Sequence, residues 1–175
     1  MIFRESKVRG VFEINLEPKA DKRGFFARSW CRKEFEEHTL NTRLVQCNVS
    51  FNTREGTLRG MHYQAAPYAE AKTVRCTRGS IYDVVVDLRP ESTTFKDWVA
   101  VNLTAEKRNM MYVPEGCAHG FLTLEDHTEV FYQMSEFYSP ESARGFRWDD
   151  PAFRIVWPGK VEVISHRDRS YADFE

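Results

Sequence analysis

The stretch GTLRGMHYQ, Gly56 to Gln64, has the composition of a β-strand that carries three polar side chains among apolar ones. Strict alternation along a strand places His62 and Gln64 on one face and Arg59 on the other. A buried polar group is costly unless it finds a hydrogen-bond partner or water. The fold around this strand therefore has to provide a polar environment for an arginine, a histidine and a glutamine.

The rest of the chain continues as short strands separated by turn residues. Helical periodicity is brief, within residues 29–40, where Ser29 is expected to cap a short helix. Many short strands at roughly even spacing predict a mainly β protein, a sandwich or jelly-roll barrel with a few short helices. The other expected strands lie within residues 44–52, 80–89, 98–103, 109–114, 120–124 and 129–134.

Two of these segments have faces of clearly different character. In 44–52 a polar face alternates with an apolar one, and two interpretations stay open. The polar face lines a ligand cavity inside the barrel while the apolar face packs against another layer, or the polar face is an outer, solvated one. The polar face holds Gln46, Asn48, Ser50 and Asn52, and the apolar face holds Val45, Cys47, Val49 and Phe51. In 80–89 one face holds Tyr82, Val84, Val86 and Leu88.

Composition narrows the class of protein. The 175 residues suffice for one domain with a sizeable core, and a hydrophobic fraction of 42% argues for a globular fold. A net charge of -1 argues against a general nucleic-acid or membrane-surface binder. We expect no signal peptide and no transmembrane segment. The four cysteines, Cys31, Cys47, Cys76 and Cys117, are expected to be small buried thiols in a reducing cytoplasm rather than disulfides or a zinc site.

Two motifs resemble those of the cupins, a superfamily of double-stranded jelly-roll barrels. Gly56 is followed by five residues and His62, with Glu70 and Gly79 further on, and the second motif appears as VPEGCAHGF, which includes His119. Metal-binding cupins use three histidines and a glutamate. Gln64 stands where one of those histidines belongs, so no metal is expected.

A longer series of segments resembles the dTDP-4-dehydrorhamnose 3,5-epimerase family, within the cupins. The match covers nearly the whole chain. It implies one cupin domain over residues 1–175, a homodimer, and an N-terminal segment exchanged between the two subunits. The matching segments, in order, are DKRGFFARSW, QCNVSFN, GTLRGMHYQ, AKTVRCTRGSIYDVVVDLR, VPEGCAHGF, RWDDPAFRIVWP and SHRD.

The resemblance implies an isomerase of nucleotide-diphosphate 4-keto-6-deoxy sugars that uses no cofactor. The ketone at C4 acidifies the C–H bonds at C3 and C5, so inversion needs a base, a stabilised enolate oxygen and an acid on the other face. By resemblance, His62 is the base and Asp168 orients it. Lys72 lies near the enolate oxygen, and Tyr132 is the acid.

The resemblance also implies the residues that bind the substrate. Arg59 and Arg23 match positions that hold the diphosphate, with Arg23 reaching across the dimer interface. Phe26 matches an aromatic that stacks on the base. Because the family uses both Arg59 and His62 in the pocket, we expect a β-bulge at Gly60 to bring them to one side. Two further residues, Gln46 and Asn48, match polar residues that line the pocket. His119 matches a position that either contacts the substrate or supports the site.

Two positions depart from the family pattern, and several alternatives stay open. Arg28 and Ala143 stand where many members carry glutamate, so the nucleotide could be a thymidine, another pyrimidine or a guanine nucleotide. The enzyme could invert C3, C5 or both. Two other classes of function also stay open. One is a ketoisomerase or sugar-binding relative of similar fold, and the other is a metal-dependent cupin oxygenase.

Overall fold

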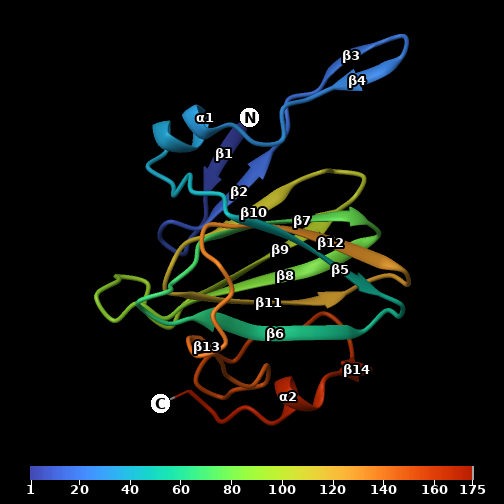
Figure 1. Cartoon of the computed structure of the whole chain (residues 1–175). Coiled ribbons are helices and arrows are strands. Elements are labelled where there is room, and N and C mark those ends of the chain that lie inside the picture. Colours follow the sequence, from blue (N-terminus) through green and yellow to red (C-terminus); the bar gives the residue numbers. More distant parts are fainter. Residues whose placement is uncertain (175) are drawn as a thin grey trace.

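The structure, a computed structural model, describes residues 1–174 and consists mainly of β-strands (Figure 1). Its two helices are α1 (Arg32–Glu37) and α2 (His166–Arg169). Neither of the helices in this part of the chain has the length and apolar character needed to cross a bilayer. The strands are β1 (Ile2–Glu5), β2 (Phe12–Asn15), β3 (Lys19–Asp21), β4 (Gly24–Phe26), β5 (Gln46–Asn52), β6 (Thr57–Gln64), β7 (Lys72–Arg78), β8 (Ser80–Asp87), β9 (Trp98–Thr104), β10 (Met110–Val113), β11 (Cys117–Thr123), β12 (Thr128–Met134), β13 (Ala143–Gly145) and β14 (Val163–Ile164).

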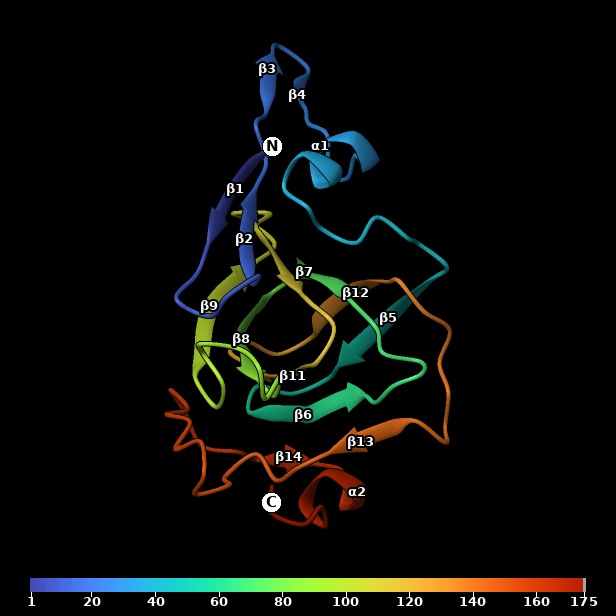
Figure 2. The same cartoon turned by 90° about the vertical axis from the view of Figure 1, so that its left-hand side faces the viewer.

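Two sheets face each other and form a barrel (Figure 2). One has the strand order β1-β2-β10-β7-β12-β5, and the other has the order β13-β6-β11-β8-β9 with β14 added beside β6. The predicted mainly β jelly-roll barrel is thus confirmed, and the expected strands appear as β5 and β8 to β12. The strand that opened the sequence analysis is β6, which lies between β11 and β13.

The space between the sheets holds one apolar core, and a second core covers the outer face of β8. The first core includes Val74, Val85, Phe121 and Val130, which are fully or almost fully buried. Burying a side chain of this size stabilises a fold by about 1.5–3 kcal/mol relative to leaving it exposed. The second core joins the predicted face of β8, Tyr82, Val84 and Val86, to Phe146, Phe153 and Trp157. It holds the C-terminal segment against the barrel, which places α2 beside β6.

Strand β6 contains the predicted bulge at Gly60. His62 pairs with His119 and Arg59 with Phe121, so β6 has one residue more than β11 between these two pairs. Gly60 has a φ of 134°, and a Cβ atom there would lie 2.6 Å from the Cα atom of Gly120. Only glycine fits this close crossing of two strands. The bulge brings Arg59 and His62 to the same pocket despite their odd spacing.

Two local predictions were wrong. The N-cap of α1 is Cys31, with no side-chain cap, rather than Ser29. The helix begins later because Phe35 is held in a buried cluster with Ile14 and Tyr112. All four cysteines are free, and Cys76 and Cys117 are buried as expected, but Cys31 is only half-buried and Cys47 is exposed because it lies on the outer face of β5.

Two apolar surfaces of this chain are left uncovered. On the outer face of β5, Val49 and Phe51 are 61% and 49% exposed. The β3–β4 hairpin projects away from the barrel at the top of Figure 1, and Phe26 within it is 77% exposed. The expected second layer over the apolar face of β5 is therefore not supplied by residues 1–174 of the same chain.

Candidate active site

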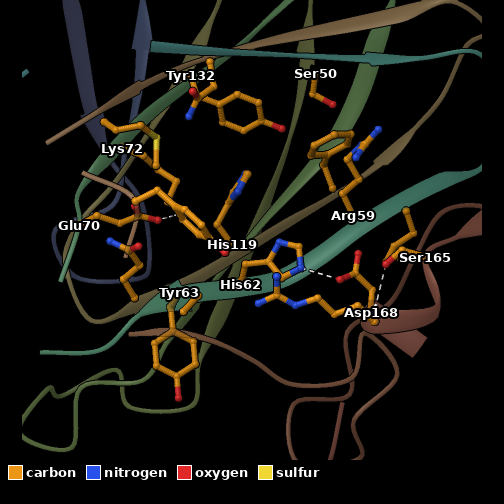
Figure 3. A pocket seen from close by; sticks show the side chains of 18 of the residues that line it. Ser50, Arg59, His62, Tyr63, Glu70, Lys72, His119, Tyr132, Ser165 and Asp168 are labelled. Carbon is orange, nitrogen blue, oxygen red and sulfur yellow. Dashed lines mark hydrogen bonds and ion pairs between the residues drawn. The ribbon is translucent and has the colours of Figure 1, made fainter. Parts of the chain in front are cut away.

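A pocket of about 790 Å³ lies between the two sheets, with part of its wall formed by β13, β14 and α2 (Figure 3). This placement decides between the two interpretations of β5, because the strand turns its polar face into the cavity. The pocket brings together eight of the predicted site residues: Gln46, Asn48, Arg59, His62, Lys72, His119, Tyr132 and Asp168.

His62 and Asp168 form a hydrogen-bonded pair, with His62 Nε2 at 2.7 Å from Asp168 Oδ1. Burial raises the pKa of Asp168, but the hydrogen bond and charge of His62 and the Gly60 N–H outweigh it and keep this pKa below its usual value. An ionised carboxylate only accepts, so Nε2 is the donor in this pair, and in the neutral imidazole Nδ1 keeps its lone pair. The imidazole is 41% exposed and Asp168 only 6%, so the pair is an oriented base open to the pocket.

Ser165 fixes the position of Asp168. Its side chain accepts a hydrogen bond from the Asp168 N–H and so caps the short helix α2. The strand before it, β14, pairs in parallel with β6 at Thr57 and Leu58. The helix cap at Ser165 and the pairing of β14 with β6 therefore hold the Asp168 carboxylate of the SHRD motif next to the His62 imidazole.

Tyr132 faces this pair from the other sheet, where it lies on β12. Burial is the main reason that its pKa is raised, and the negative charge of Asp83 adds to this. The charge of Arg59 and a hydrogen bond with Ser50 act in the opposite direction. Tyr132 is therefore protonated at neutral pH, the state that a proton donor requires.

Lys72 and His119, which line the pocket, each have a buried carboxylate partner. Lys72 Nζ lies 2.8 Å from Glu70 Oε1, and both side chains are almost fully buried. His119 Nε2 lies 2.7 Å from Asp83 Oδ1, and the His119 ring meets the Tyr132 ring edge-on at 6.3 Å. Buried side chains that are hydrogen bonded to each other in this way are held rigidly in place. The pocket thus contains two histidine–aspartate pairs, one accessible and one buried.

Two of the predicted substrate-binding residues lie away from the pocket. Arg23 is at the tip of the β3–β4 hairpin, where its guanidinium pairs with Asp21 at 2.6 Å. Phe26 lies on β4 of the same hairpin, with its ring largely in solvent. Arg28, one of the two departures from the family pattern, follows this hairpin and pairs with Glu34 at 2.8 Å.

Gln64 stands where the motif it resembles has a metal-binding histidine, and both ends of its side-chain amide make hydrogen bonds. Its Nε2 donates to the carbonyl oxygens of Tyr68 and Phe137, and its Oε1 accepts from the N–H of Ser139. Gln64 thus joins the two loops that follow β6 and β12. Among residues 1–174, no group of three or more histidine, cysteine or acidic side chains is arranged to hold a metal ion.

Sequence reasoning missed several polar residues of this site. Asp83 could have been recognised from the sequence, because it is a carboxylate within the strand 80–89, on the face opposite Tyr82, Val84 and Val86. Glu70 appeared only as a motif residue, and its pairing with Lys72 depends on the loop before β7. Arg144 and Arg167, which also line the pocket, lie on β13 and α2, which are too short to show a periodic pattern in the sequence.

Comparison with known proteins adds a consistent set of relatives. A family model described as dTDP-4-dehydrorhamnose 3,5-epimerase matches residues 5–175. A dTDP-4-dehydrorhamnose 3,5-epimerase of Shigella flexneri is 46% identical over 156 residues, which cover 87% of this chain and 86% of the relative. The crystal structure of dTDP-4-dehydrorhamnose 3,5-epimerase from Bacillus anthracis with TDP and PPi bound is similar with a TM-score of 0.94, at 37% identity and over 99% of both chains.

A relative with a different printed activity has the same fold. The structure of a 3'-monoepimerase from Streptomyces bikiniensis in complex with dTDP-quinovose is similar with a TM-score of 0.88, at 30% identity, over 96% of this chain and 85% of the other. The fold is thus common to relatives named 3,5-epimerases and to one named a monoepimerase.

Proposed function

The chain belongs to the dTDP-4-dehydrorhamnose 3,5-epimerase family, and we propose that its pocket inverts C3 and C5 of a dTDP-4-keto-6-deoxy sugar. The enzyme is an isomerase that removes and returns protons next to the C4 ketone. The observation that carries this assignment is the placement of an oriented base, His62, on one sheet and a protonated acid, Tyr132, on the other. Inversion needs these two groups on opposite faces of the sugar.

His62 removes the proton through its free Nδ1, and Asp168 stabilises the imidazolium that forms. Lys72 stabilises the negative charge that moves to the ketone oxygen. A preorganised cation in a site that excludes water contributes about 3–4 kcal/mol to such a transition state. Glu70 holds the Lys72 ammonium group in place during this step.

The substrate is held by groups around this centre. Arg59 presents a guanidinium group to the diphosphate, which suits it to bidentate binding of phosphate oxygens. Gln46 and Asn48 offer hydrogen bonds to the sugar and ribose. His119, held by Asp83, contacts the sugar near the ketone.

The remaining contacts come from a second subunit. The β3–β4 hairpin carries Arg23 and Phe26 away from their own pocket, and the outer face of β5 leaves apolar side chains exposed. We expect a homodimer in which each single-domain subunit lends its N-terminal hairpin to the partner, where Arg23 meets the diphosphate and Phe26 stacks on the base. Four unpaired cysteines fit an enzyme that works in the cytoplasm.

Proton NMR of the reaction in D2O tests the proposed function. Incubation with dTDP-4-keto-6-deoxyglucose should replace both the C3 and the C5 proton by deuterium, and both centres should appear inverted in the product. Replacement at a single centre would instead indicate a monoepimerase, as in the Streptomyces bikiniensis relative. Migration of the ketone to another carbon would indicate a ketoisomerase.

Activity should also be independent of divalent metal. The enzyme is expected to keep full activity after dialysis against EDTA, because Gln64 takes the place of a metal-binding histidine and its amide is already hydrogen bonded. The measurement is the rate of inversion before and after chelation. A loss of activity that a single divalent ion restores would contradict the mechanism proposed above.

A further inference from the structure

Asn52 lies at the end of β5, directly behind the pocket wall, and only 2% of it is exposed. Both the oxygen and the nitrogen of its side-chain amide make hydrogen bonds. The Oδ1 atom accepts a hydrogen bond of 2.7 Å from Arg59 Nε, and Nδ2 donates to the Ser50 hydroxyl at 3.4 Å and to the Thr128 carbonyl at 3.2 Å. Asn52 thus connects side chains of two strands that belong to different sheets, β5 and β6.

The contact with Arg59 determines how the guanidinium is presented. Arg59 follows Leu58 at the start of the bulge in β6, and its side chain makes one hydrogen bond within residues 1–174, through Nε. The bond to Asn52 occupies the inner edge of the guanidinium and leaves its two outer NH₂ groups for an anion. Without this anchor, a long and exposed arginine side chain would sample many rotamers.

The hydrogen bond to Ser50 connects Asn52 with Tyr132, the proposed proton donor. Ser50 lies two residues before Asn52 on the same polar face of β5, and the Tyr132 ring points toward Ser50 and Arg59 in Figure 3. A hydroxyl group and a cation close to the tyrosine oxygen both favour release of its proton. Asn52 touches both of them but does not itself line the pocket.

On the basis of the proposed function, we propose that Asn52 is a positioning residue for Tyr132, because it holds Arg59 and Ser50 beside the tyrosine hydroxyl. The same arginine is proposed to bind the diphosphate. Anchoring of the nucleotide and delivery of the proton therefore depend on one buried amide. If Asn52 only stabilised the fold, the hydrogen bond to the Thr128 carbonyl would suffice. That bond joins β5 to β12 where the backbones already pair.

Asn52→Leu tests this inference, because leucine has a similar size but makes none of the three hydrogen bonds. At saturating substrate, we expect the rate of inversion to fall about tenfold or more, while deuterium exchange through His62 falls less than about threefold. A loss of packing alone would lower both rates in proportion. The ratio of exchange to inversion therefore reports on Tyr132 and not on the stability of the fold.

Asn109→Leu is the matched control. Asn109 is also buried, and its amide also makes three hydrogen bonds, to the Thr104 N–H, the Glu13 carboxylate and the Asn102 carbonyl, in the connection between β9 and β10 and outside the pocket. We expect this variant to melt at a lower temperature but to keep the wild-type ratio of exchange to inversion. Should Asn52→Leu not fold, Ser50→Ala should shift the ratio in the same direction.

A double-mutant cycle completes the test. In a Tyr132→Phe background, Asn52→Leu should change neither rate by more than about twofold, because the group it positions is gone. A proportional fall of both rates in Asn52→Leu, or an undiminished effect in the Tyr132→Phe background, would overturn the inference. If the wild-type enzyme exchanged no substrate proton at all, the proposed function would fail instead, so the two failures are distinguishable.

Discussion

Replacing His62 by alanine is expected to lower turnover by roughly 100-fold or more, because general-base catalysis typically contributes that much. The substitution removes the proposed base while leaving the Lys72–Glu70 pair and Tyr132 intact. Both inversion and deuterium exchange should fall together, since in the proposed mechanism each begins with removal of a proton by His62. The measurement is the initial rate of both processes by proton NMR in D2O.

Binding separates a lost base from a damaged pocket. Thermal-shift titration with dTDP should give the variant nearly the wild-type affinity, and a ligand at 100 times its dissociation constant stabilises a protein by about 2.7 kcal/mol. The matched control is His166→Ala, which removes an exposed histidine from α2, the helix that carries Asp168. Near-normal turnover in His62→Ala would remove this residue from the mechanism.

Replacing Tyr132 by phenylalanine is expected to separate exchange from inversion. A base on one face can remove a proton and return a deuteron, but this restores the original configuration. Inversion needs a donor on the other face, and Tyr132 is the candidate on the opposite sheet. The variant should thus exchange substrate protons through His62 but invert the centre about 100-fold more slowly or worse.

The two rates also identify the role of the tyrosine. Only a hydroxyl group is lost, so the ring keeps its edge-on contact with His119 and the fold should persist. An equal fall of exchange and inversion would assign Tyr132 to binding or to stabilisation of the enolate. If both rates persisted, water or another side chain would be the donor, and the role of Tyr132 as the acid would have to be withdrawn.

Strand positions and the two sides of the strands could be predicted from the sequence because the period of two is a local property. The choice for Gln46 and Asn48 stayed open, because burial of a face depends on which distant strands close the barrel. The bulge at Gly60 was predictable only with the resemblance, which required Arg59 and His62 in one pocket. The close approach of Gly120 supplies the physical reason for the glycine.

Other features depend on contacts that periodicity does not encode. The start of α1 follows from the burial of Phe35 rather than from the nearest serine. The pairing of Glu70 with Lys72 depends on a loop, and Asp83 was overlooked although its position in an apolar strand was a signal. Arg23 and Phe26 are proposed to act in a second subunit, so a pattern within one chain carries no information about their neighbours.

The hydrogen bond between His62 and Asp168 joins residues 106 positions apart. During synthesis, β5 to β12 leave the ribosome before the residues of α2, so the barrel strands are present while the base still lacks its carboxylate. A chain that stops before α2 would keep the imidazole and the tyrosine but not the group that orients the base. Premature termination would therefore leave the proposed base without the carboxylate that orients it, and we expect full activity only from chains translated through residue 168.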